Sequence, residues 1–151
     1  MNRRTYLAAM SSVASAGLAG CSTVLGVLDD PTCDGEDCHI SMSRTAFIPD
    51  EYETTVGETV VWKNTSEAIH TVTAYEGGIP DDATYFASGE FEDEESAREA
   101  WDKDQGGEIR SRGRYEHTFE VPGTYSYVCI PHERGDDPMT GLIHVSETDG
   151  E

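Results

Sequence analysis

Apolar and polar residues alternate along several stretches of the chain, which is the period-2 pattern of strands with one buried face. The pattern predicts strands over residues 40–48 (with a bend), 59–64, 70–74, 115–119, 125–129 and 142–145. Turn residues such as glycine, proline, asparagine and aspartate lie between these stretches. The 151 residues are enough for one domain with a core, so we expect an all-β sandwich.

Residues 76–113 depart from the strand pattern and contain a predicted helix over residues 92–103. Ala97, Ala100 and Trp101 form an apolar stripe at helical spacing, and acidic residues crowd the first turn, where they favour the helix dipole. We expect this helix to be a short insertion that packs Trp101 on the sandwich. The alternative is a flap that docks a partner.

Soft and nitrogen donors gather in the loop after the strand at 125–129. Cys129, His132 and Met139 offer a thiolate, an imidazole and a thioether from one short loop. His70 ends a strand with its side chain predicted to point inward, and supplies a second imidazole. A Cys/His/His set with a weak axial Met is the ligand set of blue-copper electron-transfer sites.

Four motifs that contain these residues resemble one known family, the cupredoxins, and most closely their halocyanin and plastocyanin-like branch. The motifs are Gly57-x-x-Val60-x-Trp62-x-Asn64, His70-Thr71-Val72-Thr73, Pro122-Gly123-Thr124-Tyr125 and Cys129-x-x-His132 followed by Met139-x-Gly141. The resemblance extends over roughly residues 40–146, most of the mature chain. The resemblance implies a cupredoxin Greek-key β-sandwich that binds one copper ion. It also implies an electron carrier that cycles Cu(II)/Cu(I) rather than an enzyme.

The resemblance also implies residue roles. The expected ligands are His70, Cys129, His132 and Met139. The backbone amide of Thr71 is expected to donate to the ligand sulfur while its side chain ties two loops together, and Pro131 is expected to stiffen the ligand loop.

Two departures from the plastocyanin pattern affect this comparison. Six residues, 133–138, separate His132 from Met139, a longer loop than is typical of plastocyanins. Val128 stands where plant plastocyanins carry an exposed docking tyrosine, so that docking route does not carry over.

The N-terminus resembles an export signal. Arg3 and Arg4 match a twin-arginine signal, an apolar segment follows over residues 7–18, and Leu18-Ala19-Gly20-Cys21 resembles a lipoprotein cleavage box. These features predict a signal peptide over 1–20, lipidation of Cys21, a lipid-anchored tether over 21–37 and a copper-binding domain over 38–147. The protein would then be held on the outer face of the cell membrane. An ordinary signal peptide cut elsewhere is the alternative.

The net charge of the chain limits the classes of partner that it can bind. The chain has 30 acidic and 10 basic residues and a formal charge of −20, which disfavours nucleic acid and anionic lipid surfaces. Such a surface resembles that of halophilic proteins, with an acidic docking patch as an alternative. The expected partners are membrane redox proteins, met by transient docking.

The remaining cysteines, histidines and methionine have simpler interpretations. Cys33 and Cys38 predict a small-loop disulfide in an exported protein, or else a metal site with His39. Met42 and His117 are expected to be structural, and His144 to face outward.

The sequence excludes two kinds of copper enzyme and is compatible with two functions other than electron transfer. A binuclear copper enzyme needs a second cysteine near Cys129, and a multicopper oxidase needs closely paired histidine motifs; the sequence supplies neither. A copper-delivery module and a non-redox β-sandwich interaction module remain as alternatives.

Overall fold

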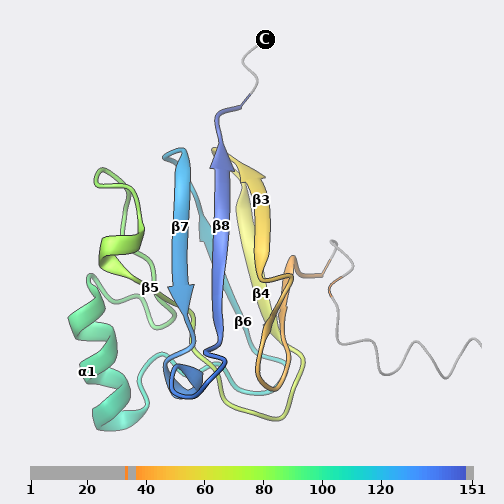
Figure 1. Ribbon diagram of the computed structural model, residues 1–151, viewed down its shortest axis with the longest axis vertical. Helices are drawn as coiled ribbons and strands as arrows, with labels where there is room; N and C mark the ends of the chain where they lie inside the picture. The colour runs from red at the N-terminus through yellow and green to blue at the C-terminus, as the bar shows by residue number, and fades with distance from the viewer. Residues whose placement is uncertain (1–32, 34–36, 149–151) are drawn as a thin grey trace, which may run out of the picture. The chain divides into compact units, whose positions relative to one another are not determined.

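The computed structural model describes Cys33 and residues 37–148, which form two four-stranded sheets (Figure 1). The first sheet has the order β2 (Phe47–Ile48), β1 (Ile40–Met42), β4 (Thr59–Asn64) and β6 (Arg114–Thr118). β1 runs parallel to β4, and the other pairs are antiparallel.

The second sheet carries the strand that leads to the predicted ligand loop. Its order is β3 (Glu51–Thr55), β8 (Thr140–Ser146), β7 (Gly123–Val128) and β5 (Thr73–Ala74). β3 and β8 are parallel, and β7 pairs antiparallel with both neighbours. The predicted all-β sandwich with a short helical insertion is confirmed.

The core consists of the inward-facing residues that the alternation predicted. In β4, Val60, Trp62 and Asn64 are buried, and in β8 Ile143 and Val145 are buried while the side chains between them are partly exposed. Trp62 is fully buried, and its ring lies edge-on to the Tyr127 ring with centroids 5.5 Å apart. Aromatic contacts of this kind join the two sheets.

Two features of the strands were not predicted. β3 was not predicted because none of its five residues is buried, so the alternation of apolar and polar residues is weak at this edge strand. Of the segment 70–74 that was predicted to be a strand, only Thr73–Ala74 forms one, and all five residues of the segment are buried. The segment is buried because residues 86–88 lie against it: the Ser88 amide donates to the Val72 carbonyl, and the Ala74 amide donates to the Phe86 carbonyl.

The insertion consists of η1 (Glu76–Gly78) and α1 (Glu94–Asp104), so the helix lies close to the predicted range of 92–103. The Asp93 side chain accepts a hydrogen bond from the Ser96 amide and caps the N-terminus. Ala97 is the buried residue of the helix. Trp101, which was expected to pack on the sandwich, is partly buried, is not among the residues of the core cluster, and lines a hollow with Ile130 and Pro131 of the ligand loop.

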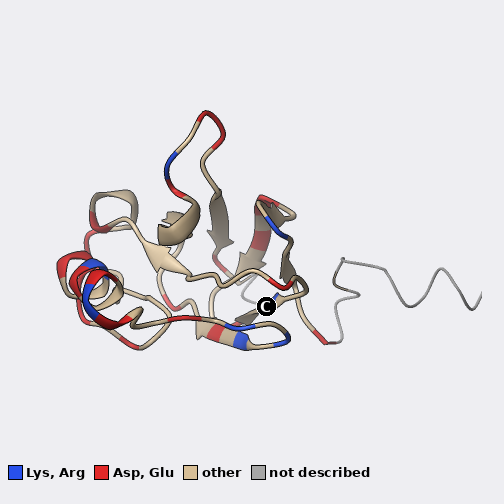
Figure 2. Ribbon diagram, turned by 90° about the horizontal axis from the view of Figure 1, so that it is seen from below, with Lys and Arg blue, Asp and Glu red and all other residues tan. Residues whose placement is uncertain are grey.

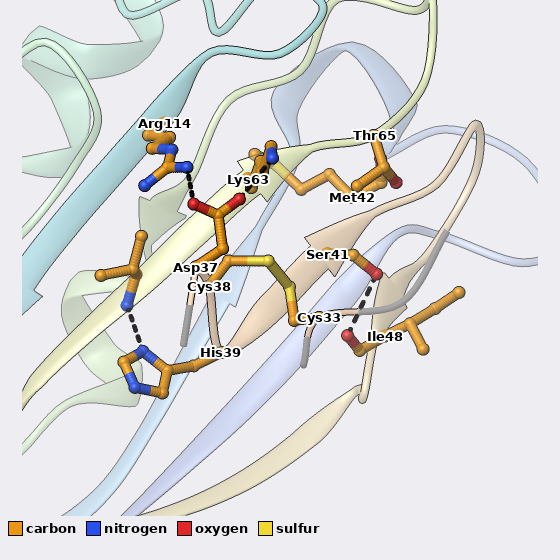
Figure 3. The surroundings of a disulfide bond; sticks show 11 residues. Cys33, Asp37, Cys38, His39, Ser41, Met42, Ile48, Lys63, Thr65 and Arg114 are labelled. Atoms are coloured by element: carbon orange, nitrogen blue, oxygen red, sulfur yellow. Dashed lines mark hydrogen bonds and ion pairs between the residues drawn. A yellow bond between two sulfur atoms is a disulfide. The ribbon is translucent and has the colours of Figure 1, made fainter. Parts of the chain in front are cut away.

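The start of the described chain is tied to the first sheet (Figure 3). Cys33 and Cys38 form the predicted disulfide, and Asp37 pairs with Lys63 and Arg114. His39 accepts a hydrogen bond from the Val61 amide at Nδ1, so the alternative metal site is not formed. The predicted signal peptide, Cys21 and nearly all of the tether lie outside the described residues. Within the described part, no helix combines the length and apolar character needed to cross a membrane.

Candidate metal centre

Three predicted ligands converge at one end of the sandwich. Cys129 directly follows β7 and is buried; its Sγ lies 3.4 Å from Nδ1 of His70 and 3.3 Å from Nδ1 of His132. All three ligand atoms lie within 4.8 Å of one another. His70 reaches this point because its backbone pairs with that of Ile109 just before β5.

His132 lies on a short helical turn, η2 (Ile130–His132). Pro131 occupies the first turn, where its fixed φ suits the geometry, and the His132 amide donates to the Cys129 carbonyl at 3.0 Å. The turn therefore brings His132 close to Cys129, which lies three positions earlier in the chain. His70 is fully buried, whereas His132 is partly exposed.

Met139 returns to the site despite the long loop. Its amide donates to the His132 carbonyl at 3.0 Å, and its carbonyl accepts from the Cys129 amide at 2.9 Å. The side chain is buried, whereas residues 134–138 are exposed. The exposed residues 134–138 therefore take up the extra length of the loop, and the backbone of Met139 stays beside Cys129 and His132.

Thr71 makes both contacts expected of it. Its amide donates to Cys129 Sγ at 3.4 Å, and its hydroxyl accepts from the Ile130 amide at 2.9 Å. The first contact stabilises negative charge on sulfur, and the second ties the His70 segment to the ligand loop.

Two residues that orient His70 were not identified from the sequence as part of the site. Ser66 Oγ lies 3.0 Å from Nε2 of His70, on the side of the ring away from Cys129. The side chain of Asn64 is fully buried and accepts hydrogen bonds from both the amide and the hydroxyl of Ser66. The available signal was the polar turn that precedes His70. A partner on the far nitrogen is the usual way in which a protein orients a ligating imidazole.

Burial sets the protonation states of the cluster. Burial and the nearby His132 lower the pKa of His70 to about 4, and burial lowers the pKa of His132. Burial raises the pKa of the Cys129 thiol to about 11, against hydrogen bonds from the Thr71 and His132 amides. Near neutral pH both imidazoles therefore keep their lone pairs, and the thiol must lose its proton when a metal binds.

The donor chemistry fits copper. One sulfur and two imidazole nitrogens form a soft, nitrogen-rich set, and the cluster identified among the described residues contains no carboxylate. Hard cations such as Mg²⁺ and Ca²⁺ prefer oxygen ligands, so the set disfavours them.

The other candidates lie away from this cluster, as expected. Met42 is fully buried in the core, and the His117 ring stacks on Phe86 with centroids 4.9 Å apart. His144 is on β8 between Thr124 and Glu51, with Nε2 3.1 Å from the Glu51 carboxylate.

Comparison with known proteins agrees with this geometry. Residues 37–146 match the family described as copper binding proteins, plastocyanin/azurin family. The chain is 31% identical over 142 residues to the chloroplastic plastocyanin major isoform of Arabidopsis thaliana, covering 93% of this chain and 70% of that protein. It is 24% identical over 132 residues to amicyanin-alpha of Methylorubrum extorquens, covering 87% of this chain and 92% of that protein.

Solved structures show the same fold. A novel purple cupredoxin from Nitrosopumilus maritimus aligns with a TM-score of 0.50 at 23% identity, covering 71% of this chain and 97% of that one. An oxidised amicyanin variant aligns with a TM-score of 0.52 at 23% identity, covering 76% of this chain and 86% of that one. The fold is therefore that of the cupredoxins, and the chain belongs to the plastocyanin/azurin family of copper-binding proteins.

Proposed function

We propose that the protein is a type 1 copper electron carrier in which His70, Cys129 and His132 bind one copper ion, with Met139 as the weak axial ligand. The observation that carries this proposal is the convergence of both Nδ1 atoms on the buried Cys129 sulfur. Copper held by such a set cycles between Cu(II) and Cu(I) and so carries one electron.

The residues around the ligands suit this role because they hold them independently of a metal. Ser66 holds His70, the Thr71 amide holds the Cys129 sulfur, and the backbone of η2 holds His132. A preformed ligand set leaves little to move when the charge at the site changes. His132 is the more exposed of the two imidazoles, so we place the electron port at its edge.

Copper titration of the full chain tests the proposal. We expect one equivalent of Cu(II) to produce the intense visible absorption of a copper–thiolate site, and one electron per copper to bleach it reversibly. Uptake of copper without that absorption would favour a delivery module, and no uptake would favour an interaction module.

The role of Met139 has a separate test. Met139→Leu should keep copper bound but raise the reduction potential, because loss of the thioether disfavours Cu(II). Cyclic voltammetry of both proteins measures the difference, and Met42→Leu in the core is the matched control. An unchanged potential in Met139→Leu would show that its sulfur is not an axial ligand.

We further propose that the protein works on the outer face of the cell membrane, held there by a lipid on Cys21. The twin-arginine motif and the Leu18-Ala19-Gly20-Cys21 box support this location. In this setting the carrier would exchange electrons with membrane redox proteins by brief encounters at the His132 edge. Small, weakly bound interfaces are typical of such encounters.

The anchor can be tested in the native host. Cys21→Ser should move an otherwise folded protein from the membrane fraction to the soluble fraction, because a thiol is needed for lipidation. Immunoblots of the two fractions measure the change. A processed Cys21→Ser protein that stays with the membranes would show that the lipid anchor is wrong.

A further inference from the structure

The inserted helix is joined to the ligand loop by one arginine. Arg98 on α1 donates from Nη1 and Nη2 to the two carboxylate oxygens of Glu133, at 2.7 and 2.9 Å. Its Nε donates to Glu94, one turn earlier on the same helix, at 2.8 Å. Figure 1 shows α1 beside the end of the sandwich at which the chain leaves β7.

Tyr75 adds a third segment to this arrangement. Its hydroxyl donates to Glu133 at 3.2 Å, and the Arg98 guanidinium lies over its ring, 5.9 Å from the centroid. We call Arg98, Glu133, Glu94 and Tyr75 the Arg98 network. It connects the residue after β5, the inserted helix and the ligand loop through side-chain contacts, and the Glu76 amide also donates to the Glu94 carboxylate at 2.9 Å.

The geometry differs from that of an ordinary surface ion pair. Exposed pairs contribute little because solvent screens them and side chains lose entropy. Here the Arg98 and Glu133 side chains are only 31% and 30% exposed, and the contact is bidentate. Bidentate arginine–carboxylate contacts add directional control to their strength.

Glu133 is the residue through which this contact reaches the metal centre. It directly follows His132, and its amide donates to the Ile130 carbonyl, which completes the turn η2. Holding the Glu133 side chain therefore holds the end of the turn that carries His132. Without Arg98, the acidic side chains of Glu94 and Glu133 would repel each other across the contact. Acidic residues are dense on α1 in general (Figure 2).

We propose that Arg98 is a positioning residue for His132: through Glu133 it holds the ligand loop against the inserted helix. This inference rests on the proposed copper function for its consequence, but its structural part concerns the chain alone. The inserted helix then restrains the loop that carries His132, where we place the electron port. Arg98→Gln should free the loop and let the His132 imidazole vary in position, which alters the copper–thiolate spectrum and the reduction potential.

The metal-free full chain provides the first measurement. The amides of Ile130, His132 and Glu133 are all hydrogen-bonded, so their hydrogen exchange reports on opening of the loop. We expect roughly tenfold faster exchange in Arg98→Gln, equivalent to about 1.4 kcal/mol. The effect should be largest at low salt, where repulsion between the remaining carboxylates is least screened.

Four further variants separate the bidentate contact from the charge of Arg98: Lys103→Gln, Arg98→Lys, Glu133→Gln, and Arg98→Gln combined with Glu133→Gln. Lys103→Gln, an exposed position on the same helix, removes the same charge and should leave exchange and spectrum unchanged. Arg98→Lys keeps the charge but loses the bidentate contact and should be intermediate. Arg98→Gln combined with Glu133→Gln should exchange no faster than the faster of the two single variants, because both changes break one contact.

The copper-loaded proteins give the deciding measurement. The inference is supported if Arg98→Gln shifts the reduction potential and the ratio of the visible absorption bands while Lys103→Gln does not. It is overturned if Arg98→Gln and Lys103→Gln both match the wild type in these readouts, even where Arg98→Gln lowers thermal stability. It is also overturned if Arg98→Gln and Glu133→Gln act additively on amide exchange. A wild-type chain that binds copper without intense absorption would refute the proposed function, and amide exchange would still decide whether Arg98 holds the loop.

Discussion

Replacing Cys129 with serine should abolish the intense visible absorption of the copper-loaded chain. The hydroxyl of serine is a hard, poorly acidic donor, whereas the absorption arises from a copper–thiolate bond. Cys129 is the free cysteine of the described chain, because Cys33 and Cys38 are joined in a disulfide. Absorption spectra recorded during Cu(II) titration of both proteins measure the effect, and we expect affinity for copper to fall as well.

Fold and metal content need controls in this experiment. Serine is close to cysteine in size, so far-ultraviolet circular dichroism should be unchanged. His144→Gln alters a histidine that bonds to Glu51 and Thr124, away from the cluster, and should retain the full absorption. Persistence of the absorption in Cys129→Ser would mean that Cys129 is not its source.

Asn64→Leu should lower the free energy of unfolding by on the order of 3 kcal/mol, because it removes four hydrogen bonds inside the protein. The Asn64 amide nitrogen donates to the Ala68 and Ile109 carbonyls at 2.6 and 2.9 Å. Its oxygen accepts from the Ser66 amide and hydroxyl at 2.9 and 2.8 Å. Leucine has a similar volume, so the loss is one of polar contacts rather than of packing.

Thermal unfolding of the metal-free chain measures this loss, which corresponds to a midpoint roughly 10 °C lower. Ser66→Ala removes only the hydroxyl that links Asn64 to His70 and should cost about 1 kcal/mol. Thr59→Val, on the same strand but exposed, should change stability by about 0.5 kcal/mol or less. A midpoint in Asn64→Leu equal to that in Thr59→Val would show that the buried network contributes little to stability.

Local sequence was enough to single out Cys129 and His132 as candidate ligands, which the structure brings together with His70, and the strand that leads to them. Cys129 and His132 are three positions apart, so the turn between them brings both to one point, and Pro131 favours that turn. Alternation alone predicted the inward faces of β4, β7 and β8, because each has one buried face in the sandwich. The same reasoning failed at β3, whose residues are not buried, and at 70–74, which is covered on both sides.

The arrangement around the ligands was decided by contacts between residues far apart in the chain. Arg98 and Glu133 are 35 positions apart, and either one alone resembles any other charged residue of a highly acidic surface. In the sequence, Ser66 and Asn64 are typical of a polar turn. In the fold, Ser66 contacts the His70 ring and Asn64 holds Ser66. A ligand type is a property of one residue, so the sequence can display it. The orientation of that ligand depends on which side chains the fold brings to its far side, and only the tertiary structure supplies that.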